Sequence, residues 1–152
     1  MSGSRATPDP RRKALELLTR REHSRRELTR KLTDRGFDAE AASLVVQDMA
    51  ERGFQDDGRF ACALARSRML AGQGPLRIRA ELRQHGIGED GVEAALAACE
   101  VDWNEHAADL LRRRFGGGEA PSRQETARRG AFLQRRGFDL DAIRHALSQC
   151  KD

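Results

Sequence analysis

The tetrapeptide RGFD occurs twice, in DRGFDAEA (residues 34–41) and in RRGFDLDA (residues 135–142), and QHGIGEDG (residues 84–91) stands almost midway between them. When the three stretches are aligned on their central glycines, the chain repeats with spacings of 50 and 51 residues. Self-similarity at such a period is typical of stacked supersecondary units. The 152-residue chain is therefore predicted to contain three copies of one small unit.

Each copy combines the end of one helix with the start of the next. The glycine can adopt the left-handed conformation that closes a helix, and the apolar residue after it packs back onto the turn. Asp38 and Asp139 then suit an N-cap, a position that Gly88 fills less well in the middle copy. Apolar residues follow at helical spacing, namely Ala42, Val46 and Met49, then Val92, Leu96 and Cys99, then Ile143, Leu147 and Cys150.

A further helix precedes each of these pairs. Asp9-Pro10 suits the start of the first, Asp56-Asp57 the start of the second, and residues 101–115 the third, which Gly116 ends. The predicted fold is all-α, with nine helices in three tandem three-helix repeats that form an elongated, curved array. We expect a disordered N-terminal tail over residues 1–8 and repeats over residues 9–52, 53–100 and 101–152.

Composition agrees with thin helical cores. Only 29 residues are Leu, Ile, Val or Phe, and the net charge is a modest +4. The N-terminus has no apolar run before its first charges, and no later segment approaches the length of a membrane span. Cys62, Cys99 and Cys150 form an odd set without short spacings, which favours a reducing compartment. We therefore expect a cytoplasmic protein with no membrane partner.

Charge alternates along the chain. Residues 87–111 contain seven acidic residues and no Lys or Arg, whereas residues 112–136 contain eight Arg and two Glu. In each unit the basic residues gather on the end of the first helix and on the second helix, and the acidic residues gather on the third. One explanation is that neighbouring helices neutralise each other; the other is that three basic surfaces bind a polyanion or an acidic protein surface.

Helical projection selects the cations that point away from the core. Arg77 is expected to pair with Glu81 across one helical turn and is left out of the set. Arg129 occupies the place held by Leu28 and Ile78, so it either extends past the core or marks a rotated helix. The candidate partner-binding or DNA-binding residues are Arg25, Arg26, Arg30, Lys31, Arg66, Arg68, Arg79, Arg83, Arg112, Arg113, Arg128 and Arg135.

The residues that usually carry catalysis are scattered or otherwise explained. Asp56 and Asp57 precede a helix and are interpreted as caps. The four histidines lack companions at ligand spacing, and no phosphate-binding loop, nucleophile elbow or dinucleotide fingerprint is present. We expect no enzyme activity, no metal and no cofactor. With no Tyr, one Trp and six Phe, base stacking is not expected to be the main mode of recognition.

Two central phrases carry a family resemblance. The stretches GFQDDGRFA (residues 53–61) and GPLRIRAEL (residues 74–82) together strongly resemble the RecX family, bacterial regulators of the RecA recombinase. The likeness extends from about Arg12 to Cys150, with weaker signatures in the outer units. It departs at Arg129, where the pattern prefers an apolar residue, and near the helix-weakening Gly130.

The resemblance implies a non-enzymatic, monomeric array that binds the RecA filament on single-stranded DNA. It implies that the protein lies in the filament groove and limits filament extension, ATP hydrolysis and strand exchange in homologous recombination and DNA repair. Weak direct binding to single-stranded DNA is a further expectation. Two alternatives stay open: a DNA-binding protein with helix-turn-helix-like units, and an α-solenoid adaptor for unrelated proteins.

Overall fold

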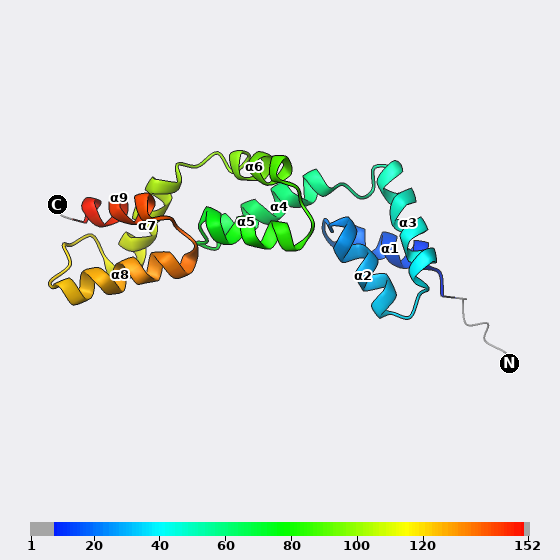
Figure 1. Cartoon of the computed structure of the whole chain (residues 1–152), viewed down its shortest axis with the longest axis horizontal. Helices are drawn as coiled ribbons and strands as arrows, with labels where there is room; N and C mark the ends of the chain where they lie inside the picture. Colours follow the sequence, from blue (N-terminus) through cyan, green and yellow to red (C-terminus); the bar gives the residue numbers. More distant parts are fainter. Residues whose placement is uncertain (1–7, 151–152) are drawn as a thin grey trace. The chain divides into compact units, whose positions relative to one another are not determined.

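The computed structural model describes residues 8–150, and over this range the chain forms nine α-helices and no strand. Most of the predicted tail, residues 1–7, lies outside the described residues. Figure 1 shows the helices in chain order. Their bounds are α1 Pro10–Arg20, α2 Arg25–Asp34, α3 Ala39–Glu51, α4 Asp57–Leu70, α5 Pro75–Gln84, α6 Glu89–Ala97, α7 Trp103–Phe115, α8 Arg123–Arg136 and α9 Leu140–Gln149.

The three repeated turns have the conformation that the sequence predicts. Gly36, Gly86 and Gly137 follow α2, α5 and α8, and their φ angles are +91°, +79° and +97°. Residues with a Cβ rarely adopt this region, so glycine is required there. Asp38 accepts a hydrogen bond from the amide of Ala41, and Asp139 accepts the equivalent bond from Ala142. The predicted stop and start of neighbouring helices is therefore confirmed.

Residues up to Phe60 form one compact unit, and residues from Ala61 onward form another. In the first unit, helices α1, α2 and α3 pack around a small apolar core, as predicted. Its buried members are Ala14, Leu17, Leu28, Leu32, Ala42, Val46 and Met49.

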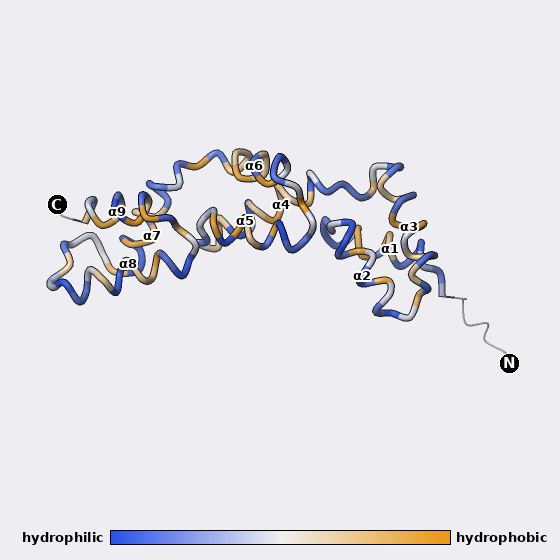
Figure 2. The backbone as a smooth tube through the Cα atoms, in the orientation of Figure 1, coloured by the Kyte–Doolittle hydropathy of each residue, from blue (hydrophilic) through white to orange (hydrophobic). Residues whose placement is uncertain are grey.

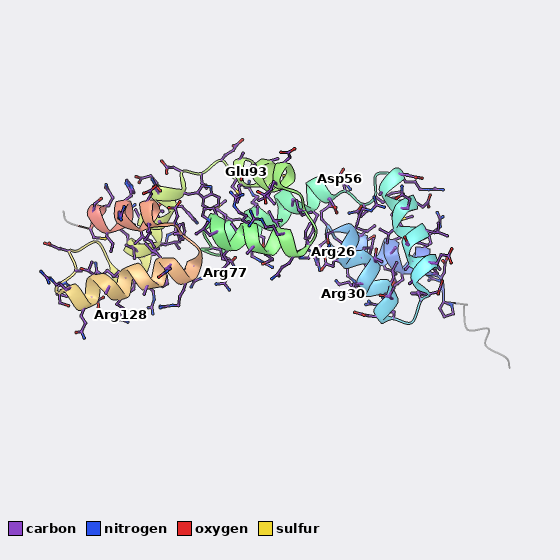
Figure 3. All side chains as sticks on the ribbon, viewed as in Figure 1. Arg26, Arg30, Asp56, Arg77, Glu93 and Arg128 are labelled. Atoms are coloured by element: carbon purple, nitrogen blue, oxygen red, sulfur yellow. The ribbon has the colours of Figure 1, made fainter. Side chains whose placement is uncertain are left out.

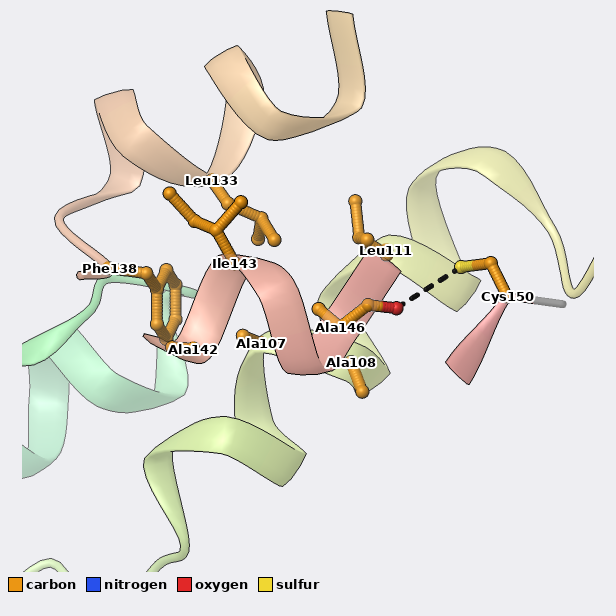
Figure 4. Close-up of a cluster of buried hydrophobic side chains, with 9 residues drawn as sticks. All are labelled: Ala107, Ala108, Leu111, Leu133, Phe138, Ala142, Ile143, Ala146 and Cys150. Carbon is orange, nitrogen blue, oxygen red and sulfur yellow. Dashed lines mark hydrogen bonds between the residues drawn. The ribbon is translucent and has the colours of Figure 1, made fainter. Parts of the chain in front are cut away.

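The second unit contains the other two sets of apolar faces. Ile78 and Leu82 on α5, with Val92 and Leu96 on α6, are buried at the positions predicted from the repeat. Helices α7, α8 and α9 enclose the cluster drawn in Figure 4, in which the Cys150 thiol donates a hydrogen bond to the carbonyl of Ala146. The remaining members of this cluster are Ala107, Ala108, Leu111, Leu133, Phe138, Ala142 and Ile143.

Backbone hydrogen bonds join the turn before α5 to the turn after α8 within the second unit. The amide of Gly74 donates to the carbonyl of Arg136 at 2.7 Å, and the amide of Leu76 donates to the carbonyl of Gly137 at 2.9 Å. The two three-helix groups of this unit are thus connected through main-chain atoms, whose positions change less readily than those of surface side chains.

Arg129 resolves an ambiguity of the sequence. Its side chain is buried, with only 6% of the residue exposed, so it takes the inward place that Leu28 and Ile78 have in the other groups. Its guanidinium donates to the carbonyl of Gly118 at 2.9 Å and lies over the ring of Phe115 at 5.4 Å. Arg129 therefore stays in the interior and holds the glycine-rich loop against α8.

Candidate partner-binding surface

The second helix of the first unit presents two of the predicted arginines outward. Arg26 and Arg30 on α2 are exposed, whereas Leu28 and Leu32 on the same helix are buried. Figure 3 labels the two arginines on this helix. No acidic side chain lies within ion-pair distance of Arg30 among residues 8–150. The charge of Arg30 is therefore not neutralised by a neighbouring carboxylate within the described residues.

Lys31 belongs instead to a polar network between α1 and α2. Arg21 forms two hydrogen bonds with the largely buried Glu27, at 2.9 and 2.6 Å. The ammonium group of Lys31 lies 3.0 Å from Nε2 of the buried His23 and 3.9 Å from Glu27. Because an ammonium group can only donate, His23 accepts through Nε2 and donates through Nδ1 to the carbonyl of Arg21.

The protonation states follow from this arrangement. Burial lowers the pKa of His23, because the charged imidazolium loses hydration and faces Arg21 and Lys31. Burial acts to raise the pKa of Glu27, but the hydrogen bonds and charge of Arg21 outweigh it, so that pKa is lowered. Burial, with the charge of Arg21, also lowers the pKa of Lys31. The network thus combines a neutral His with an ionised Glu.

Arg25 is also engaged inside the first unit. Its amide donates to Asp57 at 2.9 Å, and its guanidinium donates to the side chain of Gln47. Asp57 additionally accepts from the buried Gln55, whereas Asp56 accepts from the amide of Arg59 at 2.9 Å. The two aspartates therefore act at helix starts, as predicted, although Asp57 serves α2 rather than its own helix.

The basic and acidic helices of the middle group neutralise each other. Arg79 on α5 pairs with Glu93 and, at 3.4 Å, with Glu89, while Arg83 lies 2.7 Å from Glu89. The hydrogen bond from Arg83 lowers the pKa of Glu89 and raises the pKa of Arg83. For α5 and α6, therefore, neighbouring helices do neutralise each other, and the candidates Arg79 and Arg83 are paired with carboxylates of α6.

The predicted pairing of Arg77 with Glu81 is wrong. Glu81 is taken by Arg68 of α4, whose Nε and Nη2 atoms both donate to it at 2.9 Å. This two-point contact raises the pKa of Arg68 and satisfies the carboxylate better than a neighbour one turn away on the same helix. Arg77 instead donates to the carbonyl of Arg135 at 3.4 Å, so it belongs to the connection between the groups.

The remaining candidates differ in their surroundings. Arg112 pairs with Asp109 one turn earlier on α7. Arg66, Arg113 and Arg135 are exposed, and within the described part of the chain none of them has an acidic partner at ion-pair distance. Arg128 is 65% exposed at its side chain and pairs with Glu125 at 3.5 Å, one turn earlier on α8. In the second unit, candidate arginines without an acidic partner therefore lie on α4, α7 and α8.

An aromatic pair that the sequence prediction left aside lies in the same region. The rings of Phe115 and Phe132 meet edge to face, with centroids 5.5 Å apart. Arg114 and Arg128 lie over Phe115 at 5.6 and 5.7 Å, and Arg136 lies over Phe132 at 5.3 Å. The run Arg112 to Arg114 directly before Phe115 was the available signal in the sequence, but the spacing to Phe132 becomes visible only when α7 and α8 pack.

Figure 2 shows that α8 is predominantly hydrophilic along its length. Residues 8–150 contain no group of three or more His, Cys, Asp or Glu side chains placed to hold a metal ion. None of the helices described is both long and apolar enough to cross a membrane. What the arrangement offers is a set of exposed guanidinium groups, which bind carboxylates and phosphates.

Tandem three-helix units that expose arginines define a class of helical repeat proteins suited to binding anionic partners. Three family models match this chain in succession: the first three-helix domain of RecX over residues 11–49, the second over residues 56–96 and the third over residues 100–147. The chain belongs to the RecX family. The predicted family and the predicted all-α fold of three-helix units are therefore confirmed.

Relatives agree with this assignment. Regulatory protein RecX of Stenotrophomonas maltophilia (strain K279a) is 53% identical over 139 residues, which cover 90% of this chain and 84% of the relative. Regulatory protein RecX of Xanthomonas campestris pv. campestris (strain B100) is 50% identical over 137 residues, with coverage of 90% and 85%. Membership in a family of regulatory proteins, rather than any missing residue, supports the prediction that the chain is not an enzyme.

Solved structures support the fold. The crystal structure of RecX from Lactobacillus salivarius matches with a TM-score of 0.72 at 21% identity and covers 93% of this chain and 94% of its own. A second crystal structure of a regulatory protein RecX matches with a TM-score of 0.71 at 23% identity, with coverage of 92% and 72%. At these identities the likeness concerns the fold alone.

Proposed function

We propose that this protein binds the RecA filament on single-stranded DNA and inhibits its extension, ATP hydrolysis and strand exchange. It would thereby limit homologous recombination, DNA repair and the SOS response, acting as a monomer in the cytoplasm. The observation that carries the proposal is the match to all three RecX domain models in order along the chain. We further propose repeat boundaries at residues 9–52, 53–100 and 101–152.

The distribution of charge suits a repeating anionic target. Exposed arginines without acidic partners occur on three different helices within the described residues, with Arg30 on α2, Arg66 on α4 and Arg135 on α8. Several weak contacts on one chain raise the effective concentration of each other, so an assembled polymer is bound better than its isolated subunit. The same contacts predict that binding weakens as salt is added.

The third helices of the first two groups, α3 and α6, argue against the helix-turn-helix alternative. In three-helix DNA readers the third helix enters the major groove. Here α3 carries Glu40, Asp48 and Glu51, and α6 carries Glu89, Asp90 and Glu93, with no Lys or Arg on either helix. Such helices would be repelled by the phosphates that line a groove.

The test is the ATPase activity of RecA on single-stranded DNA with increasing amounts of this protein. The proposal predicts inhibition at amounts stoichiometric with the filament or lower. Unchanged ATP hydrolysis and unchanged strand exchange at stoichiometric amounts would refute it. A titration with duplex DNA alone completes the comparison, because tight, sequence-selective duplex binding would favour the helix-turn-helix alternative.

A further inference from the structure

An open groove lies in the second unit, between the start of α5 and the turn that joins α8 to α9. Its volume of about 490 Å³ is in the range of about 300–1,000 Å³ that is common for binding pockets. Leu76 and Leu140 line it and are 51% and 64% exposed. The buried part of its lining comes from Phe138 and Ile143, two members of the cluster in Figure 4. We name this site, which also contains Asp139 and Asp141, the leucine groove.

The two exposed leucines are not required by the repeated fold. They stand where the other copies have small or charged residues, namely Ala39 and Glu89 for Leu140, and Arg26 and Ala127 for Leu76. All four of these counterparts are exposed, so the fold buries no side chain at either position. Two exposed leucines around one apolar groove form a patch, and such patches are typical of contact surfaces.

The charge of the groove is opposite to that of the chain as a whole. None of its lining residues is basic, although the chain has a net charge of +4. Asp139 uses one oxygen to cap α9, and among the described residues no cation lies within ion-pair distance of Asp139 or Asp141. Arg77, which lies beside Gly137, donates to the carbonyl of Arg135 instead. The groove therefore complements an apolar side chain that has a positive charge next to it.

Main-chain hydrogen bonds hold the two sides of the groove in place. The amide of Leu76 donates to the carbonyl of Gly137 at 2.9 Å, and the amide of Gly74 donates to the carbonyl of Arg136 at 2.7 Å. These bonds join the start of α5 to the turn before α9, so the groove exists before a partner arrives. A preformed site loses less conformational entropy on binding.

We propose that the leucine groove binds an amphipathic helix of another protein, which inserts a large apolar side chain between Leu76 and Leu140 and places Lys or Arg beside Asp139 and Asp141. A helix suits the groove because it presents apolar and charged side chains one turn apart on the same face. The inference goes beyond the proposed function, since it uses neither the arginines nor DNA and requires a partner of the opposite charge.

The test uses the protein without RecA and without DNA, so that this inference and the proposed function can fail separately. Fluorescence anisotropy measures its affinity for a labelled amphipathic peptide of about 14 residues built from Leu and Lys, and for the same peptide with Glu in place of Lys. The net charge of +4 favours the Glu peptide. We expect the Lys peptide to bind more tightly, because its cations meet the carboxylates of the groove. Tighter binding of the Glu peptide would overturn the proposal.

The apolar side chains of the groove can be removed with residues that the repeat itself uses. Leu76→Ala with Leu140→Ala introduces the residue found at Ala127 and Ala39. We expect this double variant to bind the Lys peptide about fivefold or more weakly, with an unchanged melting curve. Asp141→Asn should weaken binding about two- to fivefold at low salt and make it less sensitive to salt.

The matched control is Leu44→Ala. Leu44 is 67% exposed on α3 and has Glu40 and Asp48 one turn away on either side, but it lies outside the groove. This variant should bind the Lys peptide as the wild type does. An equal loss in the control, or full affinity in the double variant, would show that the groove does not hold the peptide.

A second copy of the chain is the other occupant that the groove could accept. Sedimentation equilibrium distinguishes it from a foreign helix, because the proposal predicts a monomer for the wild type and for the double variant. A wild-type dimer that Leu76→Ala with Leu140→Ala dissociates would assign the groove to self-association and overturn the proposal.

Discussion

Gly74 lies so close to the backbone of Gly137 that it admits no side chain, and Arg77 excludes a side chain at Gly137. A Cβ at Gly74 would lie 2.6 Å from the carbonyl oxygen of Gly137, and a Cβ at Gly137 would lie 2.5 Å from the Cβ of Arg77. Since real Cβ atoms do not approach so closely, the backbone would have to move. This contact connects the two three-helix groups of the second unit.

Gly74→Ala should therefore destabilise the protein by about 1–3 kcal/mol, because the methyl group overpacks a main-chain contact. Gly137→Ala should cost more, since its φ of +97° is also unfavourable for alanine. The control is Gly88→Ala, where φ is −72° and no atom lies within 4 Å. Urea denaturation followed by circular dichroism measures all three, and equal stability of the Gly74 and Gly88 variants would show that the contact is not rigid.

The buried leucine of the repeat has a predictable energetic role. Leu82 is fully buried on α5, at the position that Leu32 and Leu133 hold in the other groups. Leu82→Ala should lower the free energy of unfolding by about 2–5 kcal/mol, because it removes buried apolar atoms and leaves a cavity that the surrounding helices fill only in part. Thermal melting provides the measurement. Leu76→Ala is the control, since Leu76 is half exposed and should change stability little.

The network around His23 predicts a loss of stability in mild acid. Because burial lowers the pKa of His23, the unfolded chain binds a proton at this residue more readily than the folded protein does. Above the pKa of His23 in the unfolded chain, about 6.5, this residue takes nothing from the free energy of unfolding. The free energy of unfolding decreases as the pH falls below that value. Glu27, whose pKa is also lowered, adds a further loss only at lower pH.

Urea denaturation between about pH 7.5 and pH 5.5 checks this prediction. The wild type should lose stability over this window, and His23→Gln, which cannot titrate, should lose less. An identical pH dependence in both proteins would mean that burial does not lower the pKa of His23 in the folded protein.

Reversal of charge tests the exposed arginines of α2 against the arginines of α5 that face Glu89 and Glu93. Arg26→Glu with Arg30→Glu should weaken inhibition of RecA severalfold and leave the melting temperature nearly unchanged, because both residues are exposed. Arg79→Glu with Arg83→Glu should lower the melting temperature, because the new carboxylates face Glu89 and Glu93. Full inhibition by the first variant would remove α2 from the partner-binding surface.

The fold was predictable because its signals are local. The glycine turns, the aspartate caps and the apolar stripe each depend on residues within one helix and the next, and their repetition at 36, 86 and 137 supported the assignment. Burial at the repeat positions followed from the same spacing.

The pairing of charges was harder to predict, since it depends on how helices pack. Glu81 lies one turn from Arg77 in sequence, yet it contacts Arg68 from another helix. Lys31 projects from a basic helix, yet it contacts His23. The meeting of Phe115 and Phe132 likewise requires α7 and α8 to be placed together, which composition does not specify.

The most direct test of the proposed function compares the affinity of this protein for the assembled RecA filament with its affinity for the filament's separate components. Labelled protein is titrated with RecA filaments formed on single-stranded DNA, with free RecA and with the bare strand, at low and moderate salt. We predict that the filament binds most tightly, that the bare strand binds measurably but more weakly, and that salt weakens both. Affinity for the filament no greater than for the bare strand would contradict the proposed function.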